Sequence, residues 1–420
     1  MISSRDREIE EKAQKIFNEW PRTKIVFGKD KLKETGNYAK NFGDLALIVI
    51  GKGTVKKYGY LEILTKSLEE YGIRSEVFEG VEPNPSKQTI KKIALKFKKG
   101  NYDICIALGG GSVMDAVKAA LILTSLNEDN ISLYFGVGKV SEKIERISPC
   151  ICIPTTSGTS SEITRYSNVT ILEKGLKKLI SDISIHPHYA IVDPTLTSSC
   201  PKDLTITVGL DTMTHAMEGY LNNIQDPGNE DINERALLAL ELVFKWLKVA
   251  CEEPNNYFAR KMMSIACLLG GTVIGGERFK GTAGPHMNSF SWAETIPHGN
   301  ATGIMMPYYI VYYGKNPMVM KKLEPIANML GLNEVDNIGM RVAEAMLKWY
   351  QSLGFQIKIS EFKGWKSEYK EKALKDASEN SMKLLAMPNP VPLDKVDQII
   401  GPIIQAAIDG DLSKLKLIHQ

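Results

Sequence analysis

Four side chains in the second half of the sequence have the chemistry of a metal site. Asp211 and His215 are four residues apart, a spacing that places both on the same face of a helix. His286 follows in the segment GPHMNSF and His298 in TIPHGNA. Three imidazoles and one carboxylate suit a divalent transition metal such as Fe(II) or Zn(II). Taken alone, the Asp211–His215 pair also fits a plain ion pair on a helix surface.

The other three histidines have no such neighbours. His186 and His188 lie between two apolar runs, and His419 is the penultimate residue of the chain. We therefore expect all three to be surface residues.

A run of three glycines, Gly109 to Gly111, followed by Ser112 could bind a phosphate group. The run stands at the end of the apolar segment DICIAL and at the start of a helical pattern. Glycines let backbone N–H groups approach a phosphate, and a helix N-terminus adds unpaired donors and a positive dipole. The alternative is a tight turn between a strand and a helix that binds nothing. The run is not GxGxxG, so the standard Rossmann fingerprint is absent.

A second segment rich in hydroxyl groups, PTTSGTSSE (154–162), follows the apolar run CICI. Ligands of open α/β sheets bind at the carboxyl ends of the strands, where these hydroxyls and backbone amides could hold a diphosphate. The alternative is a cluster that only caps a helix. Together with the glycine run, the segment predicts a dinucleotide site.

The elements that must position these residues change in type near residue 200. Before it, apolar runs alternate with helical patterns, which predicts a parallel sheet covered on both faces. Most of the predicted strands are continuous apolar runs, as expected for strands buried on both sides. The runs are LALIVI (45–50), RSEVFEG (74–80), DICIALGG (103–110), CICIPTT (150–156), NVTIL (168–172) and YAIVD (189–193).

After about residue 202 nearly all segments have helical periodicity. We therefore predict an α/β dinucleotide-binding domain over residues 1–202 and an all-helical metal-binding domain over 203–420. The cleft between two such domains is the usual place for a ligand. Residues 1–21 form a helical extension whose apolar side chains either pack on the same subunit or contact another.

Composition limits the function. The net charge of +3 over 420 residues argues against a nucleic-acid partner. Six scattered cysteines without a CxxC pair fit a reducing cytosol, and the charged N-terminus does not resemble a secretory signal. The apolar stretch from Met262 to Gly276 is shorter than the roughly 20 residues that a bilayer requires. It also contains four glycines, which predicts a buried helix rather than a membrane span.

Several ordered motifs resemble the iron-containing (group III) alcohol dehydrogenase family, in particular its butanol-dehydrogenase-like members. They are GVEPNPS (80–86), GGGSVMDAVKA (109–119), PTTSGTSSEIT (154–164), AIVDP (190–194), GLDTMTHAMEGY (209–220) and PHGNA (297–301). The resemblance covers roughly residues 22–400. It implies a dehydroquinate synthase-like architecture and the NAD(P)-dependent interconversion of alcohols with aldehydes or ketones.

The resemblance also implies site residues. The metal ligands, which are also catalytic, would be Asp211, His215, His286 and His298. The diphosphate would be held by Gly110, Gly111 and Ser112 together with Thr155, Thr156 and Thr159. Asp115 would stand near the nicotinamide ribose as a catalytic and cofactor-binding residue, Asn84 near the adenosine half, and Lys177 near a ribose hydroxyl.

Two features depart from the family pattern. Many members have a second histidine four residues after the third ligand, where this chain has Phe290. The interval from His286 to His298 is also short, and an ungapped alignment anchored on His298 would place Gly284 at the ligand position. We assign His286, because no other histidine is near.

The cofactor preference depends on the turn after LALIVI, which reads Gly51-Lys52-Gly53-Thr54. NAD-specific members often have an aspartate there. Without a carboxylate to repel a 2′-phosphate, and with Gly51, Lys52 and Thr54 available to bind the cofactor, we expect NADP(H) to be preferred over NAD(H). The alternative is that the lysines are only solvated.

The function that follows is a metal-dependent alcohol dehydrogenase acting on small molecules, in the cytoplasm, as a homodimer or larger assembly. Two alternatives use the same architecture: a glycerol- or glycerol-phosphate-type dehydrogenase and a dehydroquinate-synthase-like lyase. The lyase needs basic residues at its metal, and region 277–300 offers only Arg278 and Lys280. A non-catalytic nucleotide and metal sensor is the third alternative.

Overall fold

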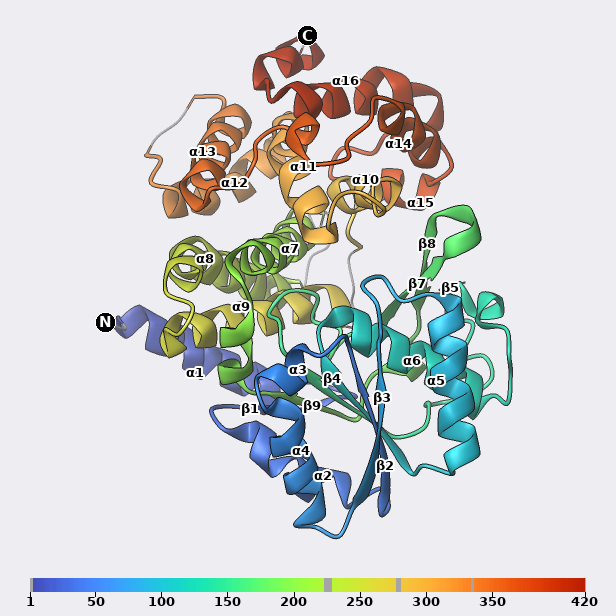
Figure 1. Cartoon of the computed structure of the whole chain (residues 1–420). Helices are drawn as coiled ribbons and strands as arrows, with labels where there is room; N and C mark the ends of the chain where they lie inside the picture. The colour runs from blue at the N-terminus through green and yellow to red at the C-terminus, as the bar shows by residue number, and fades with distance from the viewer. Residues whose placement is uncertain (1–2, 223–228, 277–280, 334–335, 420) are drawn as a thin grey trace. The chain divides into compact units, whose positions relative to one another are not determined.

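The structure is a computed structural model that describes residues 3–222, 229–276, 281–333 and 336–419 (Figure 1). Its contacts divide the chain into two units, which are described in turn. The first consists of Met1–Pro201 and Pro254–Leu268, and the second of Lys202–Glu253 and Leu269–Gln420.

This division differs from the predicted domains at residues 254–268, which were expected in the helical domain and belong instead to the first unit. Helix α9 (Tyr257–Gly275) begins in the first unit and ends in the second. Helical periodicity shows that a segment has an apolar face, but it does not show against which core that face packs. The predicted domain boundary stays a prediction, and the contacts group this part of α9 with the first unit.

Six parallel strands form the main sheet of the first unit, in the order β1-β9-β6-β4-β2-β3. They are β1 (Lys24–Phe27), β2 (Leu45–Ile50), β3 (Arg74–Glu79), β4 (Ile104–Gly109), β6 (Cys150–Pro154) and β9 (Tyr189–Val192). All but β1 coincide with a predicted run. The side chains of β3 are not buried on both faces, because β3 is at the edge of the sheet.

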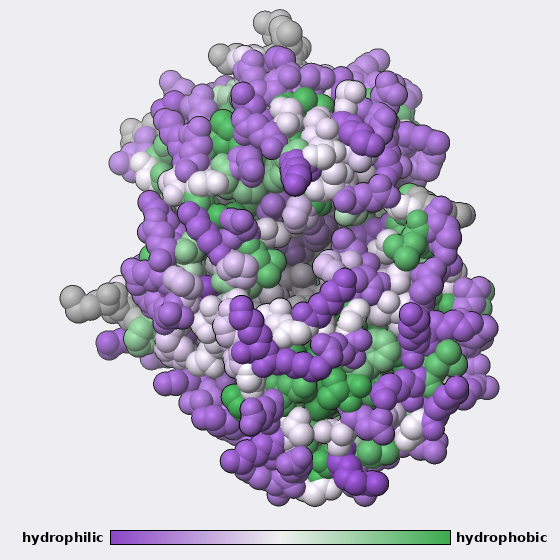
Figure 2. Space-filling model, in the orientation of Figure 1, coloured by the Kyte–Doolittle hydropathy of each residue, from purple (hydrophilic) through white to green (hydrophobic). Residues whose placement is uncertain are grey.

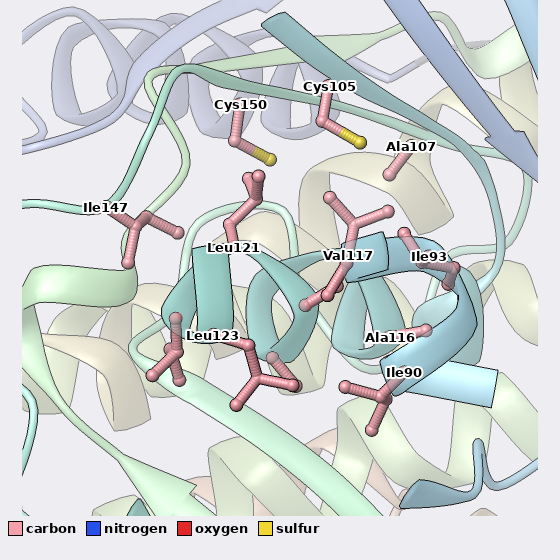
Figure 3. Packing of buried hydrophobic residues seen from close by; sticks show 14 of the residues in the cluster. Ile90, Ile93, Cys105, Ala107, Ala116, Val117, Leu121, Leu123, Ile147 and Cys150 are labelled. Atoms are coloured by element: carbon pink, nitrogen blue, oxygen red, sulfur yellow. The ribbon is translucent and has the colours of Figure 1, made fainter. Parts of the chain in front are cut away.

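Helices cover both faces of this sheet, as predicted. On one face α5 (Lys87–Gly100) and α6 (Gly111–Ser125) pack on β2, β4 and β6. Figure 3 shows Val117 and Leu121 of α6 pointing toward Cys105 and Cys150. On the other face α4 (Tyr60–Glu69) packs on the alternate residues of the same strands. A parallel sheet buried on both sides is the α/β architecture expected from the continuous apolar runs.

A separate small sheet contains one of the predicted strands. The run NVTIL lies in β7 (Tyr166–Ile171), which pairs antiparallel with β8 (Leu176–Ser181), and β8 pairs with β5 (Gly136–Val137). The expectation that NVTIL joins the parallel sheet is wrong. Only four residues separate β7 from β8, and a connection this short can join only antiparallel strands.

The N-terminal extension is helix α1 (Ser4–Asn18), which packs within its own unit. Its buried side chains include Ile9 and Phe17, and the ring of Phe17 lies 5.7 Å from that of Phe27 in β1. Just after α1, the Trp20 ring N–H donates to the backbone oxygen of Ile163 at 3.3 Å. Of the two interpretations offered for this helix, the structure shows packing on the same chain.

The prediction that His186 is a surface residue is wrong. Its side chain is buried, and burial lowers its pKa to about 3. His188 is partly buried and its Nδ1 accepts a hydrogen bond from the Cys150 backbone N–H at 3.2 Å. The side chain of His419 lies outside the described residues. The segment after β8 runs inward between apolar residues before β9, which spacing in the sequence does not reveal.

The second unit is helical throughout its described residues, as predicted. Besides the end of α9, its helices are α7 (Lys202–Leu221), α8 (Glu230–Glu252), α10 (Gly284–Ser291), α11 (His298–Tyr313), α12 (Pro317–Met329), α13 (Ile338–Leu353), α14 (Glu368–Ser378), α15 (Ser381–Leu385) and α16 (Val396–Asp409). Helix α11 is buried on all sides and packs closely on α7.

By length and composition, helix α9 is long and apolar enough to cross a membrane. However, 89% of its most apolar 18-residue stretch is buried inside the protein. A core helix of a globular protein has the same properties, in agreement with the prediction of a buried helix. Hydrophilic side chains cover most of the face drawn in Figure 2, with smaller apolar patches between them.

Candidate functional site

Helix α7 carries the first two of the predicted metal ligands. Asp211, His215 and also Glu218 recur at intervals of four and three residues, so they share one face of this helix. All three side chains are buried. Burying several ionisable groups on one helix face is costly unless they bind one another or an ion, so this face of α7 is a candidate site.

The other two predicted ligands stand in the first turns of two helices. His286 follows Pro285 in the first turn of α10, and His298 follows Pro297 as the first residue of α11. Pro285 fits the first turn of α10 because its missing N–H has no partner there in any case, and Pro297 is the N-cap residue of α11. The two prolines thus help to determine where these helices begin and where both imidazoles stand.

The three imidazoles surround one oxygen atom. The Nε2 atoms of His215, His286 and His298 lie 3.6, 3.8 and 3.7 Å from Oδ1 of Asp211. These distances are longer than hydrogen bonds. The ligand atoms of Asp211, His286 and His298 all lie within 4.8 Å of one another, whereas His215 falls outside that set although its Nε2 is near Asp211. Ligands about 2.1 Å from an ion in tetrahedral geometry lie roughly 3.4 Å apart, which is close to the separations from Asp211. Oxygen and imidazole ligands in this arrangement fit a divalent transition metal ion.

Two glycines let α11 approach α7 closely enough for this convergence. A Cβ atom at Gly299 would lie 1.9 Å from the backbone oxygen of Thr207 and 3.0 Å from Cβ of Asp211. One turn later, a Cβ at Gly303 would lie 2.9 Å from Cβ of Leu210. Any side chain at Gly299 would therefore push the start of α11, and His298 with it, away from Asp211.

The space around Gly284 and His286 bears on the assignment of the third ligand. A Cβ at Gly284 would lie 2.3 Å from the ring of Tyr309, so no side chain fits there. His286, two residues further, has its imidazole in the cluster instead, with its ring 4.9 Å from that of His215 and 5.2 Å from that of His298. The geometry favours the assignment of His286.

Phe290 lies one turn after His286 in α10, and its ring is 6.1 Å from the ring of His298. An apolar ring therefore stands beside the cluster where many relatives were expected to have a second imidazole. Phe290 is partly exposed.

Glu218 is a functional candidate that the sequence analysis missed. Its Oε2 lies 3.0 Å from Nδ1 of His286 and also accepts the backbone N–H of Ala283 at 2.7 Å. Burial raises the pKa of Glu218, and the nearby Lys383 ammonium opposes that rise. The signal was present in the sequence, because Glu218 continues the spacing of Asp211 and His215 on α7.

In the first unit the two phosphate-binding candidates lie side by side. Gly109 ends β4 and Gly110 caps α6, which begins at Gly111. A Cβ at Gly111 would lie 2.6 Å from the side chain of Thr159, and one at Gly110 would lie 3.4 Å from Oγ1 of Thr156. The two turns lie side by side because β4 and β6 are neighbouring parallel strands, so their carboxyl ends lie at the same end of the sheet.

Of the two weaker nucleotide candidates, Asn84 lies beside the glycine turn, whereas Lys177 is in the separate small sheet. The Asn84 backbone N–H donates to Oγ of Ser112 at 3.1 Å, and Thr155 donates its backbone N–H to Gly109 at 3.0 Å. Lys177 lies in β8 opposite Thr170, whose backbone N–H donates to Pro85. The hairpin of β7 and β8 is thereby attached to the segment that contains Asn84.

Asp115 connects the surrounding loops. Its carboxylate accepts hydrogen bonds from the Ser161 hydroxyl at 2.6 Å and from the Asn168 backbone N–H at 2.9 Å. One turn later in α6, the buried Lys118 ammonium donates to the backbone oxygens of Ser161 and Thr164 at 2.9 and 3.2 Å. Burial lowers the pKa of Lys118. Lys118, which the sequence analysis did not single out, helps to hold the hydroxyl-rich segment beside the glycines.

The turn after β2 is open to solvent at the residues expected to select the cofactor. Lys52 and Thr54 are exposed, whereas Gly51 is partly buried. Lys56 forms an ion pair with Glu79, at the end of the adjacent β3. A carboxylate therefore lies nearer this turn than the local sequence suggested, and it neutralises one of the lysines.

Comparison with known proteins agrees with this arrangement. The first unit matches the family model "Iron-containing alcohol dehydrogenase" over residues 21–194, and the rest matches the C-terminal model of the same family over 205–406. The chain is 29% identical to the NADPH-dependent butanol dehydrogenase of Clostridium saccharobutylicum, over 85% of this chain and 91% of the relative. It is 28% identical to the NADH-dependent butanol dehydrogenase A of Clostridium acetobutylicum, over 90% and 96%.

Solved structures are similar over most of both chains. An alcohol dehydrogenase from Oenococcus oeni is 26% identical, with a TM-score of 0.81 and coverage of 91% of this chain and 97% of that one. An iron-containing alcohol dehydrogenase from Thermotoga maritima is 31% identical, with a TM-score of 0.73 and coverage of 91% and 98%.

The fold, the site and these relatives define the class of NAD(P)-dependent alcohol dehydrogenases. Within that class, the chain belongs to the iron-containing alcohol dehydrogenase family, because the two family models together span most of its length. The lyase and sensor alternatives are not favoured.

Proposed function

We propose that this enzyme reduces small aldehydes, and oxidises the corresponding alcohols, with NADP(H) as the preferred cofactor. The observation that carries the proposal is the convergence of three imidazole nitrogens within 3.6–3.8 Å of Oδ1 of Asp211. The NADPH- and NADH-dependent butanol dehydrogenases among the relatives support a primary alcohol as substrate.

Asp211, His215, His286 and His298 would hold the metal ion, as Fe(II) or Zn(II). A bound ion would supply Lewis acidity toward the substrate oxygen, and the nicotinamide would supply or accept the hydride. The protein supplies the fixed ligand geometry through the close packing of α7 and α11. Burial of Asp211, His215 and His286 lowers the local dielectric and strengthens their interaction with a cation.

Residues at the carboxyl edge of the sheet would bind the nucleotide. Gly110, Gly111 and Ser112 would present backbone donors to the diphosphate, with Thr155, Thr156 and Thr159 beside them. The ribose roles proposed for Asp115 and Asn84 are supported by their positions near the glycine and hydroxyl-rich turns, and the role of Lys177 rests on the family resemblance. In aldehyde reduction, one hydride and one proton are added to the carbonyl group. With Phe290 beside His298, the proton would come from water or a ribose hydroxyl rather than from a second histidine.

The proposed cofactor preference can be tested by a substitution at Gly51. A Cβ there would contact Val81 and Val113 at ordinary distances of 3.6 and 3.8 Å, so a side chain fits. We expect Gly51→Asp to lower kcat/KM with NADPH about tenfold or more and to spare NADH, because a carboxylate repels the 2′-phosphate. Gly51→Asn, of equal size without charge, is the matched control. Equal kcat/KM of the wild type with both cofactors would contradict the preference.

The direct test is anaerobic oxidation of NADPH with butanal by apo-protein reconstituted separately with Fe(II) and Zn(II), with NADH in parallel. Turnover that requires metal and is faster with NADPH is the expected result. Absence of turnover with either metal, in protein that binds both metal and nucleotide, would contradict an aldehyde substrate of this kind. The comparison of the two metals decides which one supports catalysis.

We also propose that the enzyme acts in the cytoplasm as a homodimer or larger assembly. All six cysteine side chains are buried and none is in a disulfide, which suits a reducing compartment. The oligomeric state follows directly from light scattering coupled to size-exclusion chromatography. A monomer across the micromolar range would contradict the assembly.

A further inference from the structure

Glu218 determines how His286 faces the metal cluster. One carboxylate oxygen, Oε2, lies 3.0 Å from Nδ1 of His286, and the other, Oε1, accepts the backbone N–H of His286 at 3.2 Å. The contact with a carboxylate oxygen favours the tautomer in which Nδ1 of His286 carries the ring proton and donates it to Glu218. Nε2 then presents its lone pair on the side of Asp211, as a metal ligand requires.

Lys383 is linked to Glu218 by hydrogen bonds to the two sides of one peptide group. The Lys383 ammonium, from the short helix α15, donates to the backbone oxygen and to the hydroxyl of Thr282. The N–H of the same peptide group, which belongs to Ala283, donates to Oε2 of Glu218 at 2.7 Å. Hydrogen bonds in series polarise one another, so a cation at the carbonyl strengthens the N–H as a donor.

The charged groups in this series of hydrogen bonds, from Lys383 to His286, are complementary. Lys383 is partly buried, whereas Glu218 and His286 are fully or almost fully buried. Burial lowers the pKa of Lys383, and the Glu218 carboxylate opposes that shift. An ionised Glu218 would be costly in this environment without a positive charge nearby, and Lys383 supplies one without touching any proposed ligand.

We propose that Lys383 is a positioning residue for the metal centre, acting through the Thr282–Ala283 peptide group and Glu218 to orient His286. The proposal rests on the metal site of the proposed function. It deepens that function, because it assigns part of the affinity for a divalent cation to a residue that contacts neither the ion nor a ligand. Partners of metal-ligating histidines commonly change metal affinity 10- to 100-fold when they are removed.

The test is metal binding by the full-length apo-protein, with Co(II) followed by its visible absorption and Zn(II) followed by competition with a chromophoric chelator. We expect Glu218→Gln to weaken binding about 10- to 100-fold. Lys383→Met, one step further away, should weaken it about 3- to 10-fold, and Lys383→Arg should recover most of the loss because it keeps the charge. Lys370→Met is the matched control, since Lys370 is also partly buried in this unit but bonds Gln405.

A double variant separates positioning from general packing. If Lys383 acts through Glu218, then Lys383→Met in the Glu218→Gln background should cause little further loss. In Zn(II)-loaded protein labelled with ¹⁵N-histidine, His286 should keep its proton on Nδ1 in the wild type and exchange it faster with solvent in Lys383→Met. Thermal unfolding of the apo forms measures any general loss of stability. If Lys383→Met does not fold, Lys383→Gln is used in the same measurements.

Two negative results have different meanings. A wild type that binds neither Co(II) nor Zn(II) would overturn the proposed ligand set and this inference with it. A wild type that binds metal, with Lys383→Met binding equally well and showing the same His286 proton exchange, would overturn the inference alone.

Discussion

Replacing His298 with alanine should abolish metal retention and turnover together. Nε2 of His298 is 3.7 Å from Oδ1 of Asp211, and its loss would leave two imidazoles and one carboxylate. Binding free energies of four-ligand zinc sites are roughly 10–16 kcal/mol, so one ligand corresponds to about 3 kcal/mol, or about a hundredfold in affinity. Metal content after dialysis and the rate of NADPH oxidation with butanal measure the two losses.

The matched control for this variant is Glu294→Ala. Glu294 is an exposed carboxylate shortly before His298, and its removal should leave metal content and turnover unchanged. The His298 side chain is 24% exposed and so mostly buried, and thermal unfolding of the apo form measures the stability that truncation itself costs, separately from the loss of metal. A His298→Ala enzyme that turns over without metal would refute the ligand assignment.

Replacing Gly299 with alanine should weaken the same site without changing any ligand. The added Cβ would lie 1.9 Å from the backbone oxygen of Thr207, so the beginning of α11 must move away from α7. Overpacking of this kind commonly costs about 1–3 kcal/mol of stability, and more where backbone must shift. Because His298 precedes Gly299 directly, metal affinity should fall as well. Denaturant unfolding and metal titration measure both effects.

Gly401→Ala tests whether the effect is specific to this contact. Gly401 is also a buried glycine inside a helix of the second unit, α16, but the nearest atom to a Cβ there is 3.9 Å away. The substitution should change stability by less than about 1 kcal/mol and leave metal affinity unchanged, because the gain over glycine in a helix is offset by contact of the new Cβ with the ring of the following Pro402. A Gly299→Ala variant with wild-type stability and metal affinity would contradict the close approach of α7 and α11.

Local patterns in the sequence were sufficient to predict much of this fold. The run LALIVI coincides with β2 from Leu45 to Ile50, because a strand buried on both faces needs uninterrupted apolar side chains. The glycines at 109–111 mark the junction of β4 and α6 for an equally local reason. The spacing of Asp211 and His215 likewise places both on one face of α7, since helical geometry alone determines it.

Local patterns failed where a segment's environment depends on distant residues. The apolar run in β7 pairs with β8 rather than with the main sheet, and His186 is buried rather than exposed. Residues 254–268 belong to the first unit although they are as helical as the second. In each case the hydrophobic pattern shows that a face must be buried, and the tertiary structure decides against which partner.

Some features of the candidate site could likewise be predicted from the sequence, and others depended on the tertiary structure. Residue types and motif order identified the candidate ligands and the phosphate-binding turns, because that chemistry is carried by the side chains themselves. The convergence of His286 and His298 on Asp211 depends on how closely α11 packs on α7, which Gly299 permits. The link from Lys383 to Glu218 runs through one peptide group between segments far apart in the chain, and only folding brings these atoms within hydrogen-bonding distance.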